Sequence, residues 1–140
     1  MQATLAWEME GRLVVVVHGP QNPSGLEWTR FVNASLARAR GPEERVLVVS
    51  YGGAPDGAQR KELADALRTA SPTVIMTSSV VLRSLGAAFA FFNRQLNVVG
   101  INDYEGAFSY LRLSAAETTV VRRLRQTLEA RLELQRELRA

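Results

Sequence analysis

The chain contains no cysteine, one histidine and one lysine. Without cysteine it forms no disulfide and offers no thiolate nucleophile, and one histidine is too few for a multi-histidine metal site. Its apolar runs are too short and too interrupted to span a bilayer. The first residues, which include Glu8 and Glu10, lack the basic and then apolar pattern of a secretory signal. We therefore expect a cytoplasmic protein without a metal or other cofactor.

Charge is nearly balanced, with 17 basic and 14 acidic residues and a formal net charge of +3. Apart from Lys61, every basic residue is arginine. Nucleic-acid-binding proteins usually show a denser basic patch, often with interleaved aromatic residues, so we expect no nucleic-acid partner. With 140 residues, 46% of them hydrophobic, the chain is long enough and apolar enough to fold around a core.

Residues 46–67 show the organisation of the fold most clearly. They begin with the apolar run Val-Leu-Val-Val-Ser-Tyr, which is typical of a strand buried on both faces. The turn sequence Gly-Gly-Ala-Pro-Asp-Gly follows, and then a segment with apolar residues at helical spacing. A strand, a glycine-rich turn and a helix form half of a βαβ unit.

Similar patterns predict the remaining elements. Strands are expected at about 5–9, 13–17, 46–50, 73–76 and 96–101, and helices at about 24–40, 56–69, 77–92, 103–111 and 114–138. Capping boxes at Ser24 with Glu27 and at Ser114 with Glu117 mark two helix starts. Strands that are joined through helices must be parallel. The sequence therefore predicts an α/β fold with a mixed sheet of four parallel strands, one antiparallel edge strand and a long C-terminal helix.

This order resembles the STAS fold, which bacterial anti-sigma-factor antagonists share with the C-terminal domains of sulfate transporters. The resemblance runs from about Leu5 to Leu113 and rests on the hairpin of the first two predicted strands, on three strand patterns and on a short closing helix. The patterns are Leu-Val-Val-Val-Val-His-Gly, Val-Leu-Val-Val-Ser-Tyr before a loop and helix, and Thr-Val-Ile-Met-Thr-Ser-Ser before Val-Val-Leu-Arg-Ser-Leu-Gly. It implies a STAS-like domain at 1–113, a helical extension at 114–140, and a non-enzymatic regulatory module that binds another protein. A flavodoxin-like or other small doubly wound fold is the alternative.

The regulatory serine of the antagonists has no counterpart in this chain. In that family a phosphorylatable serine, within Asp-Ser-Ser-Gly, opens the helix after the second parallel strand. The corresponding stretch here is 52–57, which contains neither serine nor threonine. Asp56 would place a fixed negative charge at this helix start, or it would serve as a plain N-cap.

Polar and glycine residues follow the carboxyl ends of the predicted parallel strands, where open α/β sheets tend to bind ligands. The candidate ligand-binding residues are His18, Tyr51, Gly52, Gly53, Asp56, Ser78, Ser79 and Asp103. A small-ligand or lipid sensor is therefore an alternative function, and ordinary loop polarity with helix capping is the other interpretation. His18, Ser79 and Asp103 have the residue types of a hydrolase triad, so an unrecognised enzyme is a further alternative, although no Gly-x-Ser-x-Gly elbow occurs. The weakest alternative is metal binding by His18 together with Asp56 or Asp103.

The C-terminal helix carries leucines on more than one of its faces. We expect it to be about as long as the body is wide, so that its end overhangs and exposes Leu132, Leu134 and Leu138 to a second copy of the chain. Phe91, which falls off the apolar face of its own helix, is a further candidate interface residue. Pairs such as Arg125 with Glu129 indicate a solvated helix face. The expected partner is another protein, with a homodimer as the expected assembly.

Overall fold

The computed structural model describes residues 3–38, 43–66, 71–83 and 95–133. Its elements in chain order are β1 (Leu5–Glu10), β2 (Leu13–His18), α1 (Gly25–Arg38), β3 (Arg45–Ser50), α2 (Gly57–Ala66), β4 (Thr73–Thr77), β5 (Leu96–Val99), α4 (Tyr104–Leu111) and α5 (Ala115–Arg131). Residues 80–83 are helical as well. Each of these elements lies within a few residues of its predicted place, except that α5 ends at Arg131, before the predicted end at residue 138. Most of the helix predicted at 77–92 lies outside the described residues.

The five strands follow one another across the sheet in sequence order, β1-β2-β3-β4-β5. β1 is antiparallel to β2, and the other neighbours are parallel. This confirms the α/β class and the mixed sheet with an antiparallel edge strand. A flavodoxin-like arrangement is ruled out, because its strand order reverses within the sheet and this order does not.

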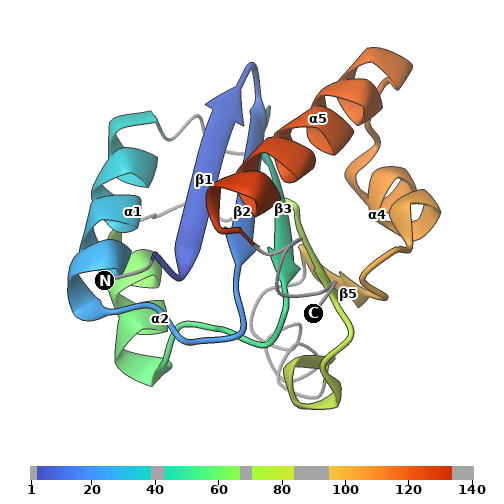
Figure 1. The fold of residues 1–140 in the computed structure, drawn as a ribbon. Coiled ribbons are helices and arrows are strands. Elements are labelled where there is room, and N and C mark those ends of the chain that lie inside the picture. Colours follow the sequence, from blue (N-terminus) through green and yellow to red (C-terminus); the bar gives the residue numbers. More distant parts are fainter. Residues whose placement is uncertain (1–2, 39–42, 67–70, 84–94, 134–140) are drawn as a thin grey trace.

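The strand order also decides where the helices lie (Figure 1). Successive parallel strands advance in one direction, and right-handed crossovers then place their helices on one face of the sheet. α1 and α2 occupy that face, whereas α4 and α5 cover the other (Figure 1). α5 contacts β1 and β2, and α4 contacts β4 and β5.

The sheet therefore separates two apolar cores, and the alternation of side chains along β2 supplies both. Val15 and Val17 face the helices α4 and α5, where the core also contains Leu47, Met76, Leu111, Val121, Leu124, Leu128 and Leu132. Val14 and Val16 face α1, where the core contains Leu5, Trp28, Phe31 and Val32. All six residues of β2 are buried, so this strand is the centre of the domain.

Local signals in the sequence set the ends of several elements. Both predicted capping boxes are present, Ser24 with Glu27 and Ser114 with Glu117. Gly11 has a φ of +58°, the left-handed conformation that the tight turn between β1 and β2 requires.

The predicted overhang of the last helix is wrong for Leu132, which is only 3% exposed. α5 lies across β1 and β2, which no other described helix covers on that face, so its leucine stripe is needed to complete the core. Ion pairs then fix α5 to the hairpin: Arg123 to Glu10 at 2.6 Å, Arg131 to Glu8 at 3.2 Å and Arg12 to Glu117 at 2.6 Å. Phe91, Leu134 and Leu138 lie outside the described residues.

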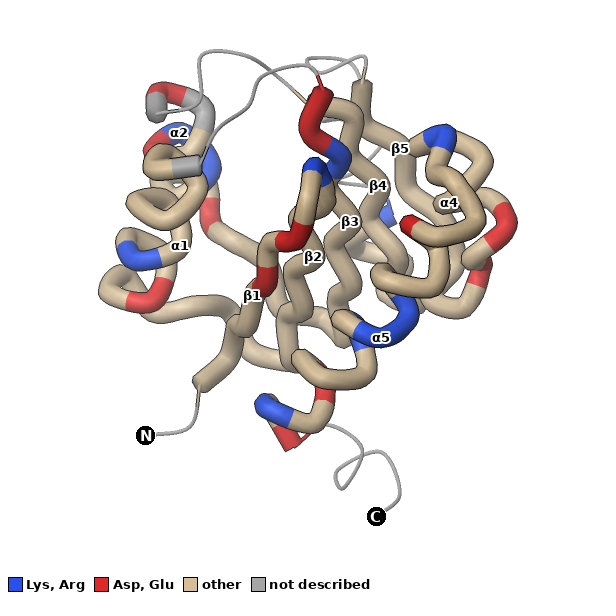
Figure 2. Tube along the Cα trace, turned by 90° about the horizontal axis from the view of Figure 1, so that it is seen from above, with Lys and Arg blue, Asp and Glu red and all other residues tan. Residues whose placement is uncertain are grey.

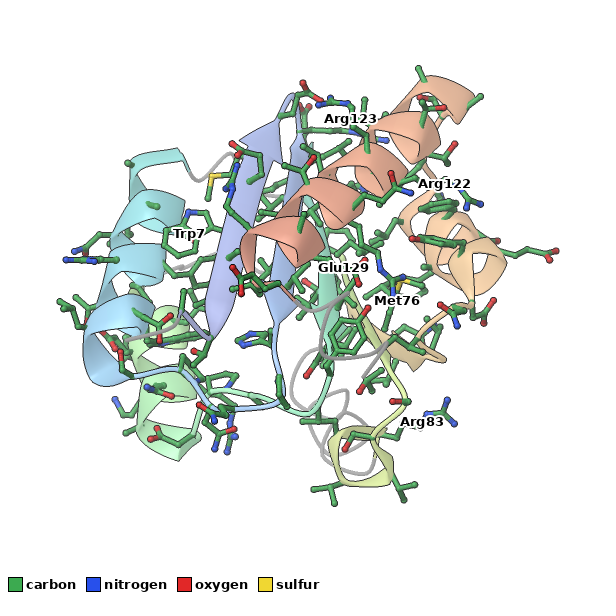
Figure 3. All side chains as sticks on the ribbon, viewed as in Figure 1. Trp7, Met76, Arg83, Arg122, Arg123 and Glu129 are labelled. Atoms are coloured by element: carbon green, nitrogen blue, oxygen red, sulfur yellow. The ribbon has the colours of Figure 1, made fainter. Side chains whose placement is uncertain are left out.

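α4 and α5 are joined by stacked side chains. Arg122 reaches from α5 to α4, where its guanidinium carbon lies 4.2 Å from the centre of the Tyr104 ring (Figure 3). Phe108 stacks on Tyr104, with 5.2 Å between the ring centres. A cation over an aromatic face is attracted by the ring, so this stack holds the two helices together.

Candidate functional site at the carboxyl edge of the parallel strands

The carboxyl ends of β2, β3 and β4 are level with one another. His18 pairs with Ser50, and Ser50 pairs with Thr77. The Thr77 hydroxyl donates to the Ser50 carbonyl at 2.9 Å. The loops that leave these strands therefore start side by side, as expected from the sequence.

His18 lies on the face of the sheet that α1 covers. It is 4% exposed and stacks on Trp28, with 6.3 Å between the ring centres. Its Nδ1 atom is buried and has no hydrogen-bond partner among the described residues. Burial lowers the pKa of His18 to about 4, although the carboxylate of Glu27 acts in the opposite direction. His18 is therefore neutral at pH 7 and offers no positive charge to an anion.

The loop after β3 is held closely against the loop after β2. The Ser50 hydroxyl donates to the Gly53 carbonyl at 2.5 Å, and the Gly53 N–H donates to the Gly19 carbonyl at 2.8 Å. Gly52 has a φ of +128°, which favours glycine, and Gly53 is buried. These glycines bring two loops into backbone contact, and that contact explains the glycine-rich sequence without a bound phosphate.

The remaining polar candidates cap helices. Asp56 accepts a hydrogen bond from the Gln59 N–H at 2.8 Å, and its own N–H donates to the Gln59 side chain at 2.9 Å. Ser79 accepts from the Leu82 N–H at 3.2 Å, and Asp103 accepts from the Gly106 N–H at 2.9 Å. Each side chain thus binds one of the backbone N–H groups that an anion at the same helix start would use.

The candidate triad is not assembled. His18 packs against α1 on one face of the sheet, whereas Asp103 caps α4 on the other. Ser78 is exposed, and Ser79 is occupied by its capping bond. The described residues contain no group of three or more His, Asp or Glu side chains that could hold a metal ion.

Tyr51 belongs to a buried polar cluster that the sequence did not predict. The Tyr51 hydroxyl contacts Glu129 and lies 3.4 Å from a guanidinium nitrogen of Arg125. Arg125 pairs with Glu129 at 3.4 Å and donates to the Ile101 carbonyl at 2.9 Å. Burial, and then the hydrogen bond to Glu129, raise the pKa of Tyr51. Through this cluster α5 fixes the loops that follow β3 and β5.

The prediction of a solvated face for Arg125 and Glu129 is wrong, because their side chains are only 5% and 11% exposed. A signal was present in the sequence. Arg125 and Glu129 directly follow Leu124 and Leu128, so all four lie on the helix face that points to the sheet. The opposite charges at this spacing suggested a surface pair, although the neighbouring leucines placed them in the interior.

No protein-family model, curated protein or solved structure matches this chain. Within the described ranges, no helix has the length and the apolar composition that crossing a bilayer requires.

The neutral, buried His18 should make stability depend on pH. The unfolded chain binds a proton at His18 below about pH 6.5, whereas the folded chain does so only near pH 4. The unfolded state then holds more protons in this window, so stability falls as the pH falls. We expect a loss of about 3 kcal/mol between pH 6.5 and pH 4, measured by urea unfolding across that range.

His18→Phe is the control for this dependence, because it removes the titrating group and keeps a ring against Trp28. Its stability should fall much less between pH 6.5 and pH 4.5. Carboxylates such as Glu117, whose pKa the hydrogen bonds from Arg12 lower to about 2, lose their contribution only at lower pH. If the free energy of unfolding of the two proteins changed equally with pH above pH 4.5, His18 would not be the cause of the pH dependence.

Proposed function

We propose that this chain is a non-enzymatic regulatory module of the STAS type, which binds another protein through the carboxyl edge of its parallel strands. The observation that carries the proposal is a pair of exposed aliphatic side chains at this edge. Val80 and Val81, which follow the end of β4, are 76% and 68% exposed. Leu26, in the first turn of α1, is 63% exposed where another helix leaves the same edge.

Exposed apolar side chains gain free energy when a partner covers them. Burying each one is worth roughly 1.5–3 kcal/mol before the entropy cost of association is subtracted. The polar groups around them are already used by the fold: Ser79, Asp56 and Asp103 cap helices, and Ser50 binds a loop carbonyl. An edge of this kind suits a protein surface better than a small polar ligand.

The arrangement of the elements supports the STAS assignment. The antiparallel hairpin, the parallel strands in sequence order and the short closing helix α4 agree with the order on which the resemblance rests. The helix start that carries the switch serine in antagonists is capped here by Asp56. We therefore propose binding without a phosphorylation switch at that helix.

Site-specific crosslinking tests this function. A photo-reactive amino acid at position 81 should form a covalent adduct with one defined protein when the variant is expressed in the source cells. The control is the same replacement at Leu36, which is 47% exposed but lies near the other end of α1. Position 36 should give no such adduct.

Two outcomes would contradict the proposal. One is the absence of a defined adduct at position 81, or the same adducts at both positions. The other is a small molecule that copurifies in stoichiometric amount and is seen by native mass spectrometry, which would favour the ligand-sensor alternative.

A further inference from the structure

The outer side of β1 carries backbone groups whose direction follows from the ladder with β2. The Gly19 N–H donates to the Thr4 carbonyl at 2.8 Å, which marks a hydrogen-bonded pair in this antiparallel register. Hydrogen-bonded and non-bonded pairs alternate along such a ladder. Ala6, Glu8 and Glu10 therefore bond to β2, whereas the N–H and C=O groups of Leu5, Trp7 and Met9 point away from the sheet.

The first of these outward residues lies beside a polar side chain. The carboxylate of Glu27 faces the Leu5 N–H and accepts from the Thr4 N–H at 2.9 Å. The outward groups of Trp7 and Met9 have no partner within the described part of the chain. Figure 2 shows β1 as the end strand of the sheet, with α1 and α2 on one side and α4 and α5 on the other. Within the described residues, no strand pairs with the outer edge of β1, where Trp7 and Met9 lie.

The side chains of β1 do not prevent another strand from pairing with this edge. Charged side chains normally discourage pairing between edges. Here Glu8 and Glu10 are paired with Arg131 and Arg123 of α5. On the other face Trp7 is half-buried, lies between β1 and α1 (Figure 3), and makes an edge contact with Phe31 at 5.4 Å. Met9 lies on the same face of β1 as Trp7 and is also half-buried.

We propose that β1 pairs with β1 of a second copy of the chain, antiparallel and across a twofold axis at Glu8. In this register Trp7 faces the partner's Met9, and Met9 faces the partner's Trp7. In each of these pairs both residues donate their N–H to the other's carbonyl, because all of these groups point away from the sheet. The two sheets join into one continuous sheet, and the interface is isologous.

The register follows from which groups are available. An axis at Trp7 would place the partner's Met9 opposite Leu5, whose N–H faces the Glu27 carboxylate beside Thr4. An axis at Met9 would place Trp7 opposite the partner's Gly11, which lies in the turn. The axis at Glu8 uses both available residues and brings an indole ring beside a thioether, a favourable cross-strand contact. Glu8 meets the partner's Glu8, but each has its own arginine at 3.2 Å.

This pairing is independent of the proposed protein-binding edge and is tested on the full, unmodified chain. Amide exchange is followed by NMR at low micromolar and at near-millimolar protein concentration. The N–H groups of Trp7 and Met9 should exchange at least about tenfold more slowly at the higher concentration. The N–H groups of Glu8 and Glu10, which bond to β2, should be protected at both. Concentration-independent exchange at Trp7 and Met9 would overturn the proposal.

A pair of variants at one position separates the backbone from the side chain. Met9→Pro removes an N–H that bonds to none of the described residues of the subunit, a change that edge strands tolerate. Met9→Ala removes the side chain and keeps the N–H. By light scattering, the wild type and Met9→Ala should dimerise, and Met9→Pro should be a monomer with unchanged far-ultraviolet circular dichroism. A monomeric wild type, or a Met9→Pro variant that dimerises as the wild type does, would overturn the proposal.

Discussion

Replacing Glu129 with leucine is expected to lower the free energy of unfolding by about 3–5 kcal/mol. The physical reason is that the Arg125 side chain, on the buried face of α5, would lose the carboxylate that balances its charge. The Tyr51 hydroxyl would lose the carboxylate to which it donates, although Arg125 would still lie beside it. Urea unfolding followed by tryptophan fluorescence measures the loss, since Trp28 lies in the core.

Two controls show whether the burial of the pair is responsible. The double variant Arg125→Met/Glu129→Leu removes both charges, so it should be more stable than Glu129→Leu alone. Lys61 and Asp65 form a pair at the same helical spacing and at 2.7 Å, but their side chains are 76% and 66% exposed. Asp65→Leu should therefore change stability far less. A Glu129→Leu variant as stable as Asp65→Leu would contradict the buried pair.

The sequence was sufficient to predict most of the fold, because its signals are local. The apolar run of β2, the capping boxes at Ser24 and Ser114 and the glycine turn at Gly11 each act within a few residues. Parallel pairing followed from the helices between the strands. The order of neighbours was not determined in this way, since a βαβ unit requires parallel strands but leaves their adjacency open.

The course of α5 depended on the rest of the molecule. Two strands of the sheet needed a cover on the face opposite α1, and α5 supplies it with Leu128 and Leu132. The sequence of a helix does not by itself show which of its apolar faces packs against the sheet. Leu132 was therefore expected at an interface, and Arg125 in solvent, although both are buried.

The sequence predicted at which edge of the sheet the candidate site residues lie, but it did not predict which way their side chains point. The strand ends do meet at one edge, as the pairing of His18, Ser50 and Thr77 shows. Whether two side chains at that edge converge depends on the face to which each strand residue points. His18 and Asp103 belong to opposite faces, and the helix starts are satisfied by their own caps. Loop polarity with capping was one of the two interpretations of the pattern, and for Asp56, Ser79 and Asp103 the structure agrees with it.

Gly53→Ala is expected to destabilise the domain by about 3 kcal/mol or more. A methyl group at this position would lie 2.1 Å from the Gln21 carbonyl oxygen and 2.6 Å from the Gly19 carbonyl oxygen. Both atoms belong to the backbone, so no side chain can rotate away to make room. The loop after β3 would have to leave the loop after β2, with loss of the hydrogen bond from the Gly53 N–H to Gly19. Urea unfolding measures the change.

Gly25→Ala is the matched control. A methyl group there meets no atom within 4 Å, and the position is the first residue of α1. Alanine is the better helix former by up to about 1 kcal/mol, so this variant should be as stable as the wild type or slightly more stable. If Gly53→Ala unfolds at the same urea concentration as Gly25→Ala, the two loops are not in the contact described. The glycine pair would then need another explanation, such as a ligand that approaches the backbone at this edge.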